Sequence, residues 1–182
     1  AFAAAVKIDS FAYMPVQDFG NAFSTFVAQN YGAGKEERIR IGIKKSVQLT
    51  LLFCIFVSAV VVLFARPLML LFVQPQETEI LAEGVKYLRI VAYFYWGIGC
   101  LFLLYGFYRA VKRPGMSVVL TVISLGMRVL LAYLLSAFVG VTGIWAAIPV
   151  GWILADVTGL VYYRCHKKDL MKFTGPPLEG EL

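Results

Sequence analysis

Apolar residues fall into five long runs that short polar connections separate. The predicted helices cover approximately residues 3–30, 45–73, 85–109, 116–139 and 143–164. Each run offers about 20 residues or more, enough for a helix to cross about 30 Å of hydrocarbon. The pattern predicts an all-α fold, a polytopic transmembrane helix bundle of about five spans. We expect one transmembrane domain over residues 1–170 and a short cytoplasmic tail over residues 171–182, disordered from Thr174 onward.

The connections between these runs alternate in charge. Residues 31–45, 109–114 and 164–172 hold twelve of the seventeen Lys and Arg residues. The connection 74–84 carries three glutamates without Lys or Arg, and the connection 140–143 carries no charge. Lys and Arg concentrate in cytoplasmic loops of membrane proteins. The first helix is therefore predicted to start outside, and the C-terminus to lie in the cytoplasm, in a multi-pass protein of the cell membrane.

Composition excludes several classes of protein. The chain has 182 residues, of which 60% are hydrophobic and 15% charged, whereas soluble domains are about 25% charged. An ordinary soluble enzyme is therefore not expected. The net charge is +6, and most of the basic residues lie between the apolar runs. We therefore expect contact with membrane lipid and no nucleic-acid partner. The chain opens on AFAAA without Met, which is typical of the interior of a longer protein.

A polar stripe follows one face of the first predicted helix. Asp18, Asn21, Thr25 and Gln29 are three or four residues apart and so share a helical face. Such a stripe can line an aqueous path, where the Asp18 carboxylate could bind a proton or a cation. It can equally form a contact between helices through polar side chains. Both interpretations stay open at this point.

Two further charged residues lie deep in the last two helices. Arg128 precedes Thr142 by fourteen residues and Asp156 follows it by fourteen. In an antiparallel hairpin that turns at Thr142, both residues would lie about 21 Å from the turn. Equal depth predicts a charge pair, either structural or part of a transport path. Apart from Asp18 and Asp156, no carboxylate is expected deep in the spans.

Few other residues indicate a binding or catalytic site. The third span is rich in aromatic residues, which can hold organic cations or simply pack, and Gly97, Gly99 and Gly106 permit close helix approach or a bend. Cysteine and histidine spacing fits no metal site, and residues 32–35 do not complete a phosphate-binding loop. No catalytic set is present, so we expect neither an enzyme nor a bound cofactor, only a coupling ion.

Several segments resemble the multidrug and toxic compound extrusion (MATE) family of transporters. The segment 26–35, FVAQNYGAGK, followed by Arg38, resembles the junction after the eighth helix of that family. Residues 7–10, KIDS, with Met14 and Pro15 are similar to the eighth helix itself. The segment 143–149, GIWAAIP, is similar to the start of the twelfth helix, and Arg113-Pro114 to the link before the eleventh. Within the family, the branch named for DNA-damage-inducible protein F is the most similar.

The resemblance implies most of the C-terminal six-helix lobe of a twelve-helix antiporter. Such a protein would export organic, often cationic, compounds in exchange for protons or sodium by alternating access. The N-terminal lobe, absent from this chain, would be the partner across the transport path. Asp18 would then be a substrate- or ion-facing group of this lobe.

Two alternatives remain at the level of sequence. A lipid-linked oligosaccharide flippase of the wider superfamily would keep the fold, although only Arg128 would supply deep positive charge. A non-transporting membrane remnant or assembly partner would suit an odd number of spans. A first lobe encoded upstream in frame would favour transport.

Overall fold

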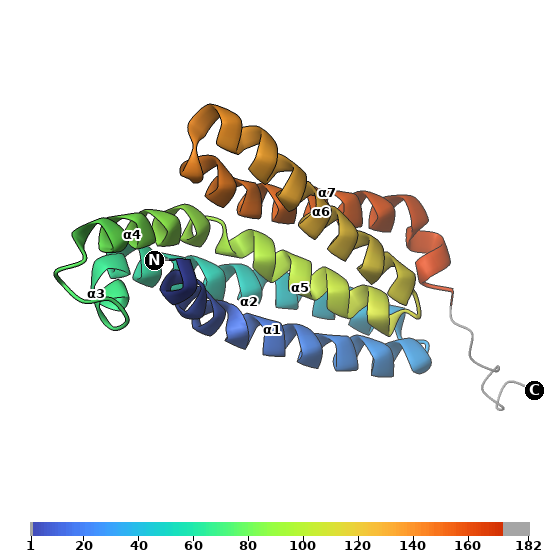
Figure 1. The fold of residues 1–182 in the computed structure, drawn as a ribbon. Helices are drawn as coiled ribbons and strands as arrows, with labels where there is room; N and C mark the ends of the chain where they lie inside the picture. Colours follow the sequence, from blue (N-terminus) through green and yellow to red (C-terminus); the bar gives the residue numbers. More distant parts are fainter. Residues whose placement is uncertain (1, 173–182) are drawn as a thin grey trace, which may run out of the picture.

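The computed structural model describes residues 2–172 as a bundle of seven α-helices (Figure 1). The expected residues 173–182 of the tail lie outside the described part. The fold is all-α, as predicted. The helices are α1 (Phe2–Gly32), α2 (Glu36–Leu63), α3 (Ala65–Leu70), α4 (Thr78–Ala92), α5 (Tyr95–Ala110), α6 (Pro114–Val139) and α7 (Val141–Leu170).

Helix boundaries follow local chemistry. Gly34 has a φ of 65°, which lets the chain turn between α1 and α2 within three residues. Glu36 and Glu37 then stand in the first turn of α2, where the helix dipole favours negative charge. The second predicted span therefore starts at Glu36 rather than near residue 45. Gly140, also with a φ of 65°, makes the tight turn between α6 and α7.

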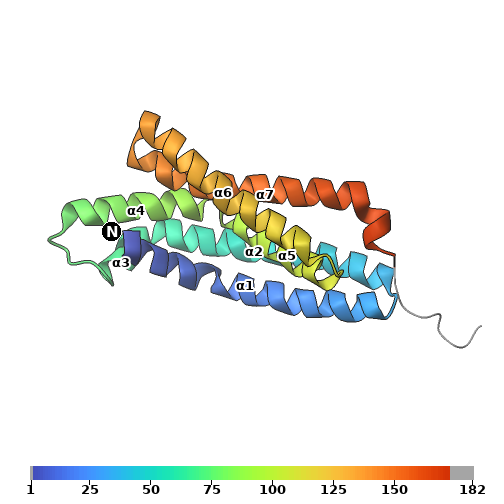
Figure 2. The ribbon, with the colours of Figure 1, turned by 45° about the vertical axis from the view of Figure 1, so that its right-hand side comes forward.

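Helix α5 is the centre of the bundle. It packs against α1, α2, α6 and α7, and ten of its sixteen residues are buried. Sequence predicted one helix over 85–109, but the structure has two, α4 and α5, bent by 53° at a short break. Figure 2 shows α4 and α5 as successive, differently inclined segments. The bend places the start of α5 inside the bundle.

Small residues let backbones approach closely. A side chain added at Gly106 would lie 2.6 Å from the carbonyl oxygen of Gly20, so α5 and α1 meet almost backbone to backbone. The same holds where Gly151 of α7 faces the Ser124 carbonyl of α6. Glycine at helix contacts is typical of membrane bundles, since close packing replaces the missing hydrophobic effect. The predicted close approach at Gly106 is confirmed.

Three helices, α2, α6 and α7, are long and apolar enough to cross a membrane, and the bent pair α4–α5 gives up to four spans. Helix α1 has 31 residues but is not among them, so up to four spans are found where the sequence predicted about five. The apolar run of α1 is interrupted by charged and amide side chains, among them Gln17, Asp18 and Asn21. Only 11% of the apolar window of α6 is buried within the chain, against 50% for α7. Much of α6 therefore presents apolar side chains outward, as a surface for lipid or further protein does.

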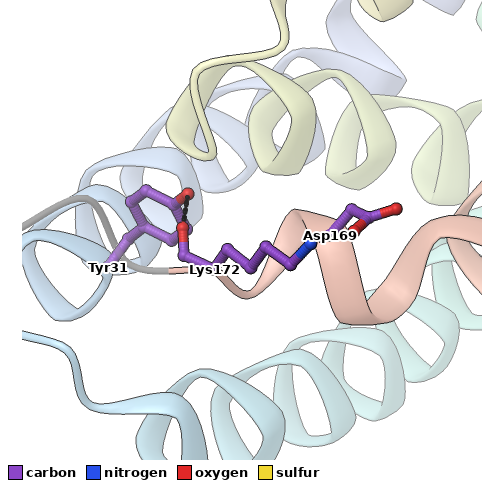
Figure 3. A network of polar contacts seen from close by, with 3 residues as sticks. All are labelled: Tyr31, Asp169 and Lys172. Carbon is purple, nitrogen blue, oxygen red and sulfur yellow. Dashed lines mark hydrogen bonds and ion pairs between the residues drawn. The ribbon is translucent and has the colours of Figure 1, made fainter.

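The three basic connections meet at one end of the bundle. The Tyr31 hydroxyl donates a hydrogen bond to the Lys172 carbonyl at 3.0 Å, and Lys172 pairs with Asp169 at 2.7 Å (Figure 3). Lys112 and Arg113 line the same open cavity, of about 640 Å³, as Tyr31 and Lys172. The N-terminus and the turn between α6 and α7 lie at the opposite end (Figure 1). The charge alternation along the sequence thus corresponds to two distinct ends of the molecule.

Candidate functional site

The polar stripe of α1 lies on the outside of the bundle. The four residues Asp18, Asn21, Thr25 and Gln29 are all exposed in the described chain. The opposite face of α1 packs into the core through Val16, Phe23 and other buried residues. The four residues of the stripe share one face of α1, as predicted. Their role in binding stays a prediction.

Beside the stripe, α1, α5 and α6 enclose an open groove of about 440 Å³. Asn21 forms part of its wall and accepts a hydrogen bond from the Arg109 guanidinium at 3.0 Å. Gln17, Tyr105, Ser117 and Thr121 add further polar groups to the lining. Such a combination of amide, hydroxyl, phenol and guanidinium groups can bind a polar organic molecule through several hydrogen bonds.

Asp9 is a carboxylate that sequence reasoning missed. Only 3% of its surface is exposed, and it accepts a hydrogen bond from the Tyr95 hydroxyl. The expectation that Asp18 and Asp156 were the only deep carboxylates was therefore wrong. A seven-residue spacing could have identified it: Asp9, Val16 and Phe23 recur on the buried face of α1.

Asp9 belongs to a larger buried polar group. Tyr87 of α4 and Arg128 of α6 both interact with its carboxylate electrostatically. Tyr87 itself is buried and stacks edge-on against Trp145 of α7, with ring centroids 5.8 Å apart. Helices α4, α5 and α6 thus each contribute a polar side chain that interacts with Asp9 of α1.

The predicted charge pair between Arg128 and Asp156 is not formed in this structure. Both carboxylate oxygens of Asp156 are buried without a hydrogen-bond partner. The hairpin turns at Gly140, two residues before Thr142, which shifts the register of facing residues. Arg128 consequently faces Gly151, where an added Cβ would lie 3.4 Å from that of Arg128. Asp156 lies five residues further along α7 and packs toward Gly97 of α5.

The aromatic residues of the third predicted span do not form one cradle. Tyr95 and Tyr108 are buried, and the Tyr108 hydroxyl donates to the Gly159 carbonyl at 2.6 Å. Tyr105 lines the groove beside α1, while Tyr93 and Trp96 line an apolar hollow against α2. The bend and helical periodicity direct these rings to different neighbours.

The described residues hold no group of three or more His, Cys, Asp or Glu side chains that could bind a metal ion. His166 stacks on Tyr162, with ring centroids 4.3 Å apart, near the basic end of α7. Cys54 is buried, Cys100 is partly buried and Cys165 is exposed, all as free thiols. The polar groups that remain for function are the outward stripe, the adjoining groove and the buried carboxylates.

Sequence comparison relates this chain to known transporters. The MatE family profile matches residues 1–134. The chain is 31% identical over 172 residues to the probable multidrug resistance protein YpnP of Bacillus subtilis, covering 94% of this chain and 38% of YpnP. It is 29% identical to a FAD transporter of Shewanella oneidensis, covering 92% and 36% of the two chains. The chain thus spans less than two fifths of the length of these relatives.

Solved structures share the fold. An inward-facing MATE family transporter superposes with a TM-score of 0.84 at 20% identity, covering 96% of this chain and 40% of that one. A MATE transporter of Vibrio cholerae gives a TM-score of 0.84 at 22% identity, covering 93% and 39%. The described helices therefore share the fold of these structures. This chain, by its sequence match and its fold, belongs to the MATE family of membrane transporters.

Proposed function

We propose that the chain forms most of the C-terminal lobe of a secondary antiporter that exports organic cations in exchange for protons or sodium. The lobe would stand in the cell membrane with its basic end in the cytoplasm. The missing N-terminal lobe would face it across the transport path. Motif resemblance further favours the branch named for DNA-damage-inducible protein F.

The polar stripe of α1 is the observation that carries this proposal. A helix inside a membrane protein does not expose Asp18, Asn21 and Thr25 to hydrocarbon, because charged and polar side chains there are costly. Their exposure fits a surface that faces water and another lobe. The groove beside the stripe supplies a concave wall on which a substrate can rest.

Alternating access would follow from the rocking of two lobes around this wall. Asp18 would attract a cationic substrate or ion to the interface between the lobes. Arg109, whose guanidinium donates a hydrogen bond to Asn21, would form the wall of the groove on its α5 side. An ion or substrate shifts the equilibrium only if it binds one open state more tightly than the other.

The test is Asp18→Asn in the complete transporter. We expect efflux of a fluorescent organic cation to fall toward that of cells lacking the protein, with normal amounts in the membrane. Glu79→Gln, an exposed carboxylate at the start of α4, serves as the matched control and should leave efflux unchanged. Undiminished efflux by the Asp18 variant would overturn the assigned role.

A second candidate is export of an anionic dinucleotide. One relative is named a FAD transporter, and Arg109 brings a guanidinium into the groove. Guanidinium groups bind phosphates through paired hydrogen bonds. Competition between the fluorescent cation and FAD in membrane vesicles separates the two candidates. Inhibition by FAD that Arg109→Gln removes would favour the anionic substrate.

A further inference from the structure

Polar groups from three helices converge on the first turns of α5. The Asp9 carboxylate of α1 binds the Tyr95 hydroxyl. The Asp156 carboxylate of α7 lies toward Gly97, where an added Cβ would stand 3.8 Å from Oδ2. Thr50 of α2 packs against Gly99, its methyl carbon 2.8 Å from the position of an added Cβ. All three polar residues are buried.

Asp156 differs from Asp9 in having no hydrogen-bond partner among the described residues. Its residue is 6% exposed, and neither oxygen has a hydrogen-bond partner. The titratable side chains near it on α5 are Cys100 and Tyr105, both of which interact with it electrostatically. Arg128 of α6 faces Gly151 instead, and Asp9 of α1 is held by Tyr95.

An ionised carboxylate in this position would be expensive. Burying a charge without a partner is strongly unfavourable in proteins, and the group is retained when it binds an ion or carries out a function. Metal cations collect several oxygen ligands, and the described residues bring no group of three or more His, Cys, Asp or Glu side chains together. A proton satisfies the carboxylate without further ligands.

The break between α4 and α5 lies next to this site. The chain bends by 53° there, and the Ser58 hydroxyl of α2 donates to the Ala92 carbonyl at 2.6 Å, occupying an oxygen at the end of α4. Gly97 occupies the first turn of α5, where helix amides attract negative charge. An ionised Asp156 would therefore be drawn toward the start of α5, whereas a protonated one would not.

We propose that Asp156 is a proton-binding site of this lobe and that loss of its proton changes the bend between α4 and α5. This inference rests on the proposed antiport. It names the coupling ion as a proton and assigns it a residue away from the α1 stripe. Discontinuous helices serve as ion sites in many secondary transporters because the break frees backbone groups and permits motion.

The first test is chemical. Dicyclohexylcarbodiimide forms a stable adduct with protonated carboxyl groups in apolar surroundings. In the full-length transporter, mass spectrometry should find the adduct on Asp156 at neutral pH, decreasing as the pH rises. Asp169→Asn, which removes an exposed carboxylate of the same helix, should leave this labelling unchanged. Absence of the adduct on Asp156, or labelling independent of pH, would overturn the inference.

The second test separates the inference from the proposed function. Asp156→Asn is nearly isosteric and mimics the protonated form, so the protein should fold. In proteoliposomes we expect this variant to lose transport driven by a proton gradient but to retain exchange of labelled for unlabelled substrate. Proton-driven transport by Asp156→Asn equal to wild type would overturn the site. A wild-type protein without any antiport would instead overturn the proposed function, and the labelling result would stand separately.

Discussion

At the scale of single residues, burial separates three aspartates that all lie within apolar stretches. Asp18 is exposed on the stripe of α1. Asp9 is buried with a tyrosine hydroxyl, and Asp156 is buried with none. The same side chain therefore occurs in three different environments in one chain: exposed, hydrogen-bonded to another helix, and buried without a hydrogen-bond partner, where we propose that it binds a proton.

The Asp9–Tyr95 hydrogen bond should stabilise the bundle. Tyr95→Phe removes the donor while leaving the ring in place, and an unsatisfied buried carboxylate costs about 1–3 kcal/mol. We expect a lower melting temperature of the full-length transporter in detergent. Tyr93→Phe, two residues earlier and 62% exposed, should leave the melting temperature unchanged. Equal stability of both variants would contradict a stabilising role for this hydrogen bond.

At the scale of elements, α5 organises the lobe because four helices pack against it. Its glycines set how closely those helices approach, and its first turn receives the buried polar groups. The aromatic and glycine content of this segment was visible in the sequence. The bend that directs each side chain was not, because a helix break depends on contacts from α1, α2 and α7.

The contact between α1 and α5 should tolerate no side chain at Gly106. A methyl group there would meet the Gly20 backbone oxygen, and overpacking of this kind costs about 1–3 kcal/mol. Gly106→Ala should therefore lower thermal stability. Gly126→Ala on α6 is the control, since an added Cβ there meets nothing within 4 Å, and it should preserve or slightly raise stability. A stable Gly106→Ala variant would show that α1 and α5 can separate without loss.

At the scale of the whole molecule, the basic connections gather at one end and the acidic and uncharged ones at the other. The contact of Tyr31 with Lys172 joins two of these connections directly (Figure 3). The outward apolar face of α6 and the polar stripe of α1 leave two unlike surfaces uncovered. A membrane and a second lobe would cover them respectively.

This polarity predicts which side of the membrane each end faces. Cys165, an exposed thiol near the basic end, should react with a membrane-impermeant maleimide in inside-out vesicles but not in intact cells. Glu79→Cys, at the other end, should show the reverse. Both experiments use the complete transporter with its other cysteines replaced. Labelling of Cys165 from outside would contradict the cytoplasmic placement of the C-terminus.

Sequence alone determined the helical fold, the alternation of the two ends and the shared face of the polar stripe. Hydrophobic periodicity and charge act locally along the chain, so they can be read without knowing any neighbour. The family motifs lie in such local segments as well. The end of α1 and both ends of α6 could be predicted for the same reason, because glycine or proline stands at each of these boundaries.

Tertiary structure alone decided which polar side chains meet. The hairpin turn at Gly140 set a register that separates Arg128 from Asp156, although equal spacing along the sequence suggested a pair. The bend between α4 and α5 carried Tyr95 to Asp9 and placed Gly97 beside Asp156. Pairing depends on helix register and rotation, and a shift of two residues at a turn moves facing side chains by about a full helical turn. Local pattern fixes which face is polar, while packing fixes which polar groups remain without a partner.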